Sequence, residues 1–207
     1  DPWRIAVALS DSSVRIVNVA TTPTTAHMPP VDKEGSCQCI DVGKLLREEK
    51  AKAAAGNGDG DKAAAKESVS PHSTGVCWSP NDSLLVVCLG DGSVAVIDLT
   101  TQQGPTLRTL IKAHRSSCYG ATFLPSPPPP VRSGKAKERK TEPRTVCATW
   151  SSDGSLALWD LSSGLSEDVT DPLLRHELKD YPIYACAILP PEEPEAQDGG
   201  SELTMAL

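Results

Sequence analysis

The C-terminal half contains four residues whose types could form either a catalytic site or a buried hydrogen-bonded group: His114, Thr149, Asp153 and Trp159. A hydroxyl activated by an imidazole that a carboxylate orients is the arrangement of a nucleophilic triad. The same side chains also satisfy one another as a buried hydrogen-bonded group, because each donor finds an acceptor. The sequence contains no oxyanion-hole motif of the Gly-x-Ser-x-Gly type, so a structural role is favoured over catalysis.

These residues belong to a stretch that begins at His114 and ends in Trp159-Asp160. The stretch resembles one whole repeat of the WD-repeat family, whose signature is a Gly-His start and a Trp-Asp end. An Ala replaces the Gly here, and an insertion lengthens the unit. In the expected tetrad, Asp153 accepts a hydrogen bond from one His114 nitrogen, and the other nitrogen accepts one from the Thr149 hydroxyl. The Thr149 oxygen in turn accepts from the indole N–H of Trp159.

Three segments of the chain repeat one pattern, in which an apolar run is joined to an alternating run by an Asp-containing turn. This pattern predicts a β-hairpin in each copy. The three turns are marked by Asp11, Asp91 and Asp153. In the first two copies Val7 and Val87 stand at the position of Thr149, and Val17 and Ile97 stand at the position of Trp159. We expect those two copies to be held by apolar packing alone.

Upstream of the later hairpins lie apolar runs that end in Pro, at 75–80, 118–125 and 183–190, and each predicts an inward strand. The resemblance implies an all-β fold, a partial WD-repeat β-propeller with about three blades of a seven-bladed ring. We expect the 207 residues to be a fragment of a longer protein. The expected units are the end of one repeat (1–20), a polar, partly helical or disordered insertion (21–70), a degenerate second repeat (71–100), a third repeat (101–161) with a Pro/Lys-rich insertion (125–143), and the start of a fourth (162–207) with an acidic insertion (190–202).

Composition narrows the class of protein further. The sequence has no run of roughly 18 apolar residues, so no membrane-spanning helix is predicted. Its seven cysteines are odd in number and fall mostly in expected strands, which favours a reducing, intracellular compartment, cytoplasmic or nuclear. Cys37 and Cys39 form a Cys-x-Cys in an expected loop without a second pair at zinc spacing. Neither a metal nor a cofactor is expected.

Two of the insertions carry distinctive sequences. Residues 45–55 are rich in Ala, Lys and Glu, which favours helix, but few apolar residues are present to dock such a helix. A solvated, partly disordered loop is therefore favoured over a binding helix. The second insertion joins a polyproline stretch at 127–130, which we interpret as an extended spacer, to a basic cluster. That cluster, a possible contact for nucleic acid, consists of Lys135, Lys137, Arg139 and Lys140.

These patterns predict a non-catalytic scaffold or adaptor that binds other proteins within a multiprotein complex. The candidate partner contacts follow His114 at the start of the expected repeat and are Arg115, Ser116 and Tyr119. One alternative is a substrate receptor of a cullin-type ubiquitin ligase, but the Trp-Asp-x-Arg ending of such receptors is absent after Trp159. The other is a propeller subunit of a nucleic-acid-associated complex, which the net charge of −7 disfavours.

Overall fold

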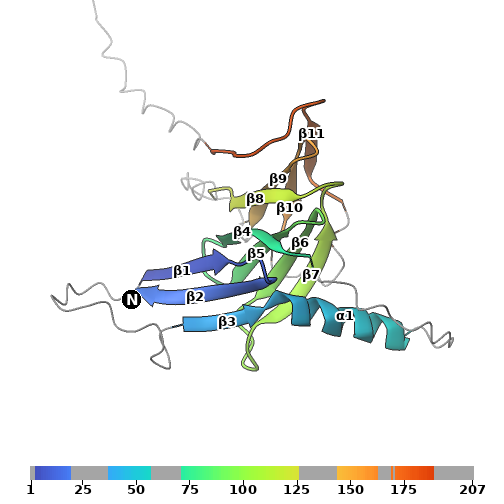
Figure 1. Cartoon of the computed structure of the whole chain (residues 1–207). Coiled ribbons are helices and arrows are strands. Elements are labelled where there is room, and N and C mark those ends of the chain that lie inside the picture. The colour runs from blue at the N-terminus through green and yellow to red at the C-terminus, as the bar shows by residue number, and fades with distance from the viewer. Residues whose placement is uncertain are drawn as a thin grey trace, which may run out of the picture.

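Three antiparallel sheets and one helix make up the computed structural model, which describes residues 3–19, 37–56, 71–125, 144–162, 169 and 171–188 (Figure 1). The chain is thus mostly β-sheet, in agreement with the predicted all-β class. Sheet 1 contains β1 (Trp3–Ala8), β2 (Ser13–Val19) and β3 (Cys37–Asp41). Sheet 2 contains β4 (Ser73–Trp78), β5 (Leu84–Leu89), β6 (Ser93–Asp98) and β7 (Thr106–Lys112). Sheet 3 contains β8 (Cys118–Phe123), β9 (Val146–Ser151), β10 (Ser155–Asp160) and β11 (Leu174–Glu177).

One hairpin in every sheet, β1–β2, β5–β6 or β9–β10, closes through the same kind of turn. The carboxylate of Asp11, Asp91 or Asp153 accepts the backbone N–H of the serine two residues later, at 3.0, 3.0 and 2.9 Å. Such a bond holds an Asx turn. The residue between them has a positive φ of 66° at Ser12, 85° at Gly92 and 77° at Gly154. Glycine adopts that conformation without steric cost, so two of the three copies place it there.

Each sheet is a meander, in which strands that follow one another in the chain lie side by side. The outer strand β7 pairs with β6, although its residues fall in the range predicted as the third repeat. In the same way β11 pairs with β10, although its residues fall in the range predicted as the start of the fourth repeat. A sequence repeat therefore contributes strands to two successive sheets.

Sheet 2 lies between the other two and is buried on both faces. We call the face that carries Val7, Val87 or Thr149 the upstream face of its sheet, and the opposite one the downstream face. The upstream face of sheet 2, with Leu85, Val87 and Ile97, packs on the downstream face of sheet 1, with Val14, Ile16 and Ile40. The downstream face of sheet 2, with Val86, Val94 and Val96, packs on the upstream face of sheet 3, with Cys147, Ala157 and Trp159. Burial on both faces explains why β5 is continuously apolar rather than alternating.

The insertion at 21–70, predicted to be partly helical or disordered, contains a strand and a helix among its described residues. Cys37 and Cys39 lie in β3, paired with β2, and not in a loop as predicted. The helix α1 (Val42–Gly56) follows directly, and the Asp41 carboxylate caps it by accepting the Lys44 N–H at 2.7 Å. Val42 and Leu46 are buried against sheets 1 and 2. Two buried residues one turn apart are thus enough to dock the helix, which corrects the expectation of a solvated loop.

The inward strand of a fourth repeat was predicted at 183–190, but the described residues of this region, 181–188, form no strand ladder. They run along sheet 3, where the Ile183 N–H donates to the Ser151 carbonyl at 3.0 Å and the Trp150 indole donates to the Tyr184 carbonyl at 3.2 Å. The residues that follow, 189–207, lie outside the described part of the chain. In the described part of the chain, no helix has the length and apolar character needed to cross a membrane.

Candidate functional site: a buried polar network between two sheets

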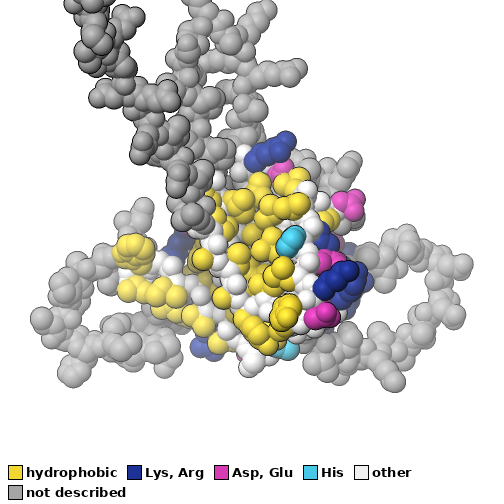
Figure 2. Space-filling model, turned by 90° about the horizontal axis from the view of Figure 1, so that it is seen from above, with side chains coloured by type: hydrophobic (Ala, Val, Ile, Leu, Met, Phe, Trp, Pro, Cys, Tyr) yellow, Lys and Arg dark blue, Asp and Glu magenta, His cyan; other side chains and the backbone are white. Residues whose placement is uncertain are grey.

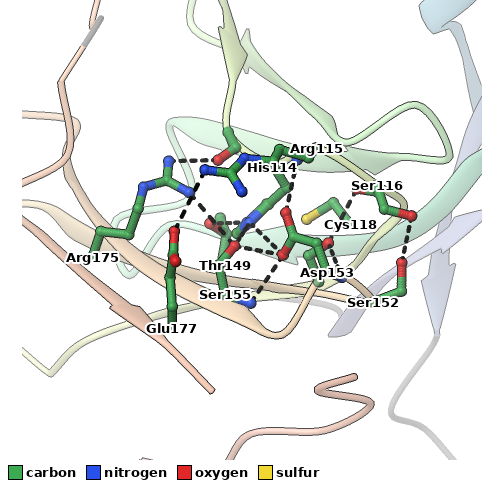
Figure 3. A network of polar contacts seen from close by, with 12 residues as sticks. His114, Arg115, Ser116, Cys118, Thr149, Ser152, Asp153, Ser155, Arg175 and Glu177 are labelled. Carbon is green, nitrogen blue, oxygen red and sulfur yellow. Dashed lines mark hydrogen bonds and ion pairs between the residues drawn. The ribbon is translucent and has the colours of Figure 1, made fainter. Parts of the chain in front are cut away.

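His114 and Thr149 meet in the interface between sheets 2 and 3 (Figure 3), and Trp159 joins them there. The Trp159 indole N–H donates to the Thr149 hydroxyl oxygen at 2.9 Å. The same hydroxyl lies 2.9 Å from Nε2 of His114. Thr149 and Trp159 are at most 1% exposed, and His114 is 8% exposed. Because these polar groups are buried, each needs the partner that the others supply.

The sequence predicts a direct hydrogen bond between His114 and Asp153, but Asp153 does not form one. Its Oδ1 lies 3.8 Å from Nδ1 of His114, beyond hydrogen-bond distance. The Ser155 hydroxyl stands between them, 2.6 Å from Nδ1 and 2.6 Å from the Asp153 carboxylate. A serine that donates to a carboxylate must accept from the imidazole, so Nδ1 carries the proton and Nε2 accepts from Thr149. The network is therefore a chain of five side chains rather than four.

The Asp153 carboxylate is held ionised by several donors. Burial raises its pKa, but hydrogen bonds from the Ser155 hydroxyl, the Arg115 N–H and the Ser155 N–H outweigh that effect and lower the pKa to about 2. The Arg115 N–H donates to Oδ2 at 2.7 Å. Asp153 thus closes its own turn and also anchors the chain just after His114. The Asp-x-Ser pattern repeated at Asp11, Asp91 and Asp153 was the sequence signal that could have drawn attention to Ser155.

The network is arranged to hold sheets together rather than to attack a substrate. The Thr149 hydroxyl is fully buried and already engaged by two partners. A nucleophile needs an approach path for the reacting carbonyl, and this oxygen has none. Among the described residues, no group of three His, Cys, Asp or Glu side chains could hold a metal ion.

Two arginines that the sequence analysis did not single out also join sheets 2 and 3. Arg175 of β11 donates to the Ala113 carbonyl at 2.7 Å and reaches the Ser155 hydroxyl at 3.5 Å. Arg108 of β7 donates to the Ser162 carbonyl at 2.8 Å. Charged donors to backbone carbonyls at sheet edges leave no pattern in the sequence, because their partners come from distant segments.

The predicted contact residues lie at the end of sheet 3 that carries the Asp153 turn. The Arg115 side chain is 86% exposed, with its guanidinium 3.8 Å from the Glu177 carboxylate. The Ser116 hydroxyl accepts from the Ser152 hydroxyl at 2.8 Å. Tyr119 stacks on Tyr184 with ring centroids 5.4 Å apart. The basic cluster Lys135, Lys137, Arg139 and Lys140 lies outside the described residues.

Apolar side chains are exposed at both ends of the stack of sheets. Seen from above, from the side where sheet 3 lies in Figure 1, hydrophobic side chains form a broad patch (Figure 2). The exposed large side chains of this region are Tyr119, Leu173, Leu174, Leu178, Tyr181 and Tyr184. At the other end, the upstream face of sheet 1 exposes Trp3, Ile5, Val7, Val17 and Val19. Contiguous apolar patches of this kind mark surfaces that another protein element covers.

The function of this chain has to be inferred from these two features, a buried polar network that joins two sheets and apolar surfaces at both ends of the stack. The first supplies rigidity, and the second offers sites for contact. No family model matches the chain, and no curated protein sequence matches it either.

Proposed function

We propose that this chain is part of a WD-repeat β-propeller that serves as a non-catalytic scaffold for other proteins. The observation that supports this most is the repeated face-to-face packing of the sheets. The upstream face of sheet 2 covers sheet 1, and the upstream face of sheet 3 covers sheet 2. Blades of a propeller pack in this head-to-tail order, so that each sheet uses its two faces differently.

A recurring backbone hydrogen bond supports the equivalence of the three sheets. The carbonyl of the positive-φ turn residue, Ser12, Gly92 or Gly154, accepts an N–H from the segment that follows the outer strand. The donors are Val42, His114 and Leu178, at 3.0, 3.0 and 2.8 Å. Val42 and Leu178 thus occupy the place of His114. Sheet 1 and sheet 3 keep the backbone contact of the repeat where the histidine is absent.

A propeller also accounts for the open surfaces. Sheet 1 has no strand equivalent to β4 or β8 among the described residues, so the edge of β1 that faces away from β2 has no ladder partner there. Its apolar upstream face is the face that, in sheets 2 and 3, packs on a preceding sheet. We infer that a further sheet belongs on it. Residues 181–188 cover part of the downstream face of sheet 3 in the place where a following sheet would begin.

The scaffold role rests on the surface at the turn end of sheet 3. Arg115 is exposed beside Glu177, and Tyr119 of β8 is exposed and stacked on Tyr184. Arg and Tyr provide many of the anchors in protein interfaces. The rigid network beneath fixes the Arg115 backbone through Asp153. A surface that is exposed, amphipathic and held on a rigid element is suited to binding a protein partner.

An affinity purification with matched variants tests this proposal. The full-length protein is tagged, purified from its own cells at moderate salt with and without nuclease, and its partners are quantified by mass spectrometry. We expect stoichiometric, nuclease-resistant partners that Arg115→Glu depletes at least tenfold. Arg144→Glu is the matched control, because its side chain is 74% exposed at the opposite end of sheet 3. Partners lost on nuclease treatment, or no partners at all, would contradict the scaffold proposal.

A further inference from the structure

Four cysteines meet across the interface between sheets 2 and 3. Cys77 of β4 and Cys88 of β5 lie on the downstream face of sheet 2, and Cys118 of β8 and Cys147 of β9 lie on the upstream face of sheet 3. Cys88, Cys118 and Cys147 are at most 1% exposed and belong to the same hydrophobic core. All four are reduced thiols in this structure.

Cys88 and Cys118 lie in the same buried cluster, where sheets 2 and 3 pack on each other. Gly75, the ladder partner of Cys88, has no side chain to keep the sheets apart. A Cβ at Gly75 would lie 3.7 Å from the Cβ of Cys88 and 3.1 Å from the Tyr119 carbonyl, next to Cys118. The Thr74 hydroxyl also hydrogen-bonds to the Cys118 carbonyl. The strand that carries Cys118 is therefore held directly against the strand pair that carries Cys88.

The pKa values of the Cys88 and Cys118 thiols are shifted in opposite directions. Interaction with the Cys88 thiol lowers the pKa of Cys118 to about 6, burial opposes this, and His114 contributes in the same direction as Cys88. The same interaction with Cys118, together with burial, raises the pKa of Cys88. Burial also raises the pKa of Cys147. Because the thiolate is the reactive form of cysteine, Cys118 is the attacking sulfur and Cys88 the resolving one.

We propose that Cys88 and Cys118 are a disulfide site that a hydroperoxide oxidises, covalently joining sheet 2 to sheet 3. The Cys118 thiolate attacks the terminal peroxide oxygen, so that an S–O bond forms and the O–O bond breaks. The leaving group is hydroxide from hydrogen peroxide or alkoxide from an organic hydroperoxide, and it takes up a proton from water. The Cys88 sulfur then attacks the Cys118 sulfenic acid, forming the S–S bond and breaking the S–O bond, and water leaves with the Cys88 proton. Two electrons pass from the sulfur pair to each peroxide.

Burial sets the rate of this reaction. Both sulfurs are covered by the packed sheets, so the peroxide reaches Cys118 only when the interface opens transiently. The exposed Cys39 thiol has no such barrier and reacts first. Once formed, the disulfide prevents the two sheets from separating and restricts the unfolded chain. The oxidised protein is therefore more resistant to unfolding than the reduced one.

Peptide mapping of the native full chain tests the site. Cys37, Cys39 and Cys186 are changed to Ser, because they are the other thiols with exposure at the surface, and the folded protein is treated with hydrogen peroxide, alkylated and digested with trypsin. Cys77 and Cys88 fall in peptide 67–108, Cys118 in peptide 116–132 and Cys147 in peptide 145–175. We expect a reducible link between 67–108 and 116–132, which fragmentation assigns to Cys88. A link to 145–175, sulfinic acid at Cys118 without a link, or four unmodified thiols would overturn the proposal.

A thermal melt gives a second, independent readout with a matched control. Peroxide is expected to raise the melting temperature on the order of 5 °C or more, and dithiothreitol is expected to reverse the rise. Cys147→Ala, a buried cysteine of the same cluster, keeps the peroxide-dependent rise. Cys88→Ala and Cys118→Ala each abolish it. A rise that survives in Cys88→Ala would assign the effect to another pair and contradict the site.

Discussion

Sheets 2 and 3 have the same strand order and the same turn, yet they bury opposite kinds of side chain at equivalent positions. Val87 and Ile97 of sheet 2 pack fully buried on sheet 1. Thr149 and Trp159 of sheet 3 are equally buried on sheet 2, but they belong to a hydrogen-bonded chain that also includes His114, Ser155 and Asp153. The backbone arrangement therefore requires only that the volume be filled. Polar side chains can occupy these buried positions when each of them has a hydrogen-bond partner.

Sheet 1 provides the third case. Its equivalent residues, Val7 and Val17, are 42% and 36% exposed. The same apolar residue types thus form a core in sheet 2 and a surface in sheet 1. The difference lies in the presence of a neighbouring sheet and not in the residues themselves.

Truncating Trp159 of sheet 3, or its equivalent Ile97 of sheet 2, should lower the free energy of unfolding the most. Trp159→Ala leaves a cavity and removes a donor, so we expect the free energy of unfolding to fall by about 3 to 5 kcal/mol. Ile97→Ala, which leaves only a cavity, should cost about 2 to 5 kcal/mol. Urea unfolding monitored by circular dichroism measures both. A loss below about 1 kcal/mol for Trp159→Ala would show that the polar network is not part of the folded core.

Two nearly isosteric substitutions should distinguish the polar network of sheet 3 from the apolar packing of sheet 2. Thr149→Val leaves Nε2 of His114 and the indole N–H of Trp159 each without a partner, and we expect a loss of about 2 to 4 kcal/mol. The reverse exchange in sheet 2, Val87→Thr, buries one hydroxyl without a partner and should cost about 1 to 3 kcal/mol. Equal melting temperatures for Thr149→Val and the wild type would contradict the hydrogen-bond assignment.

Asp153→Ala should have a smaller effect, because Asp153 acts on His114 only through Ser155. We expect a loss of about 1 to 3 kcal/mol, measured by the same urea titration. Ser155→Ala is the companion variant, since it interrupts the same chain one step nearer to His114. An unchanged melting temperature for both variants would remove Ser155 and Asp153 from the network.

The lowered pKa of Asp153 predicts that the stability of the protein depends on pH in the acid range. The folded pKa of Asp153 is about 2, lowered from its ordinary value near 4 by hydrogen bonds that outweigh the effect of burial. A group with a lowered folded pKa contributes stability that is fully present above its unfolded pKa and is lost as the pH falls through the folded pKa. The stability difference between the wild type and Asp153→Ala should therefore shrink between about pH 4 and pH 2. A constant difference across that range would contradict the ionised state of Asp153.

The smallest effect is expected in sheet 1. Val17→Thr changes a residue that is 36% exposed, so the free energy of unfolding of this chain should change by less than about 0.5 kcal/mol. The same exchange at the buried equivalent, Ile97→Thr, should be clearly destabilising. In a longer chain that supplies a sheet to cover Val17, we expect the cost of Val17→Thr to rise toward that of Ile97→Thr. A large cost in the present chain would show that the face is already covered.

Much of the fold was predictable from local patterns. The three hairpins follow from apolar runs joined by Asp turns, and the structure places Asp11, Asp91 and Asp153 in those turns. The docked helix was not predicted, because its propensity is clear but only Val42 and Leu46 anchor it. The helix is stabilised by contact with two sheets, and tertiary contact of this kind often outweighs a weak amphipathic pattern.

The sequence by itself determined the turns, the alternation of the strands and the residue types that could form the polar network, because these depend on backbone conformation and on donors and acceptors. Only the tertiary structure decided that Ser155 stands between His114 and Asp153 and that Cys88 and Cys118 share one buried cluster. Both depend on how closely sheets 2 and 3 approach. Such a distance is set by packing between segments far apart in the chain, and no local pattern records it.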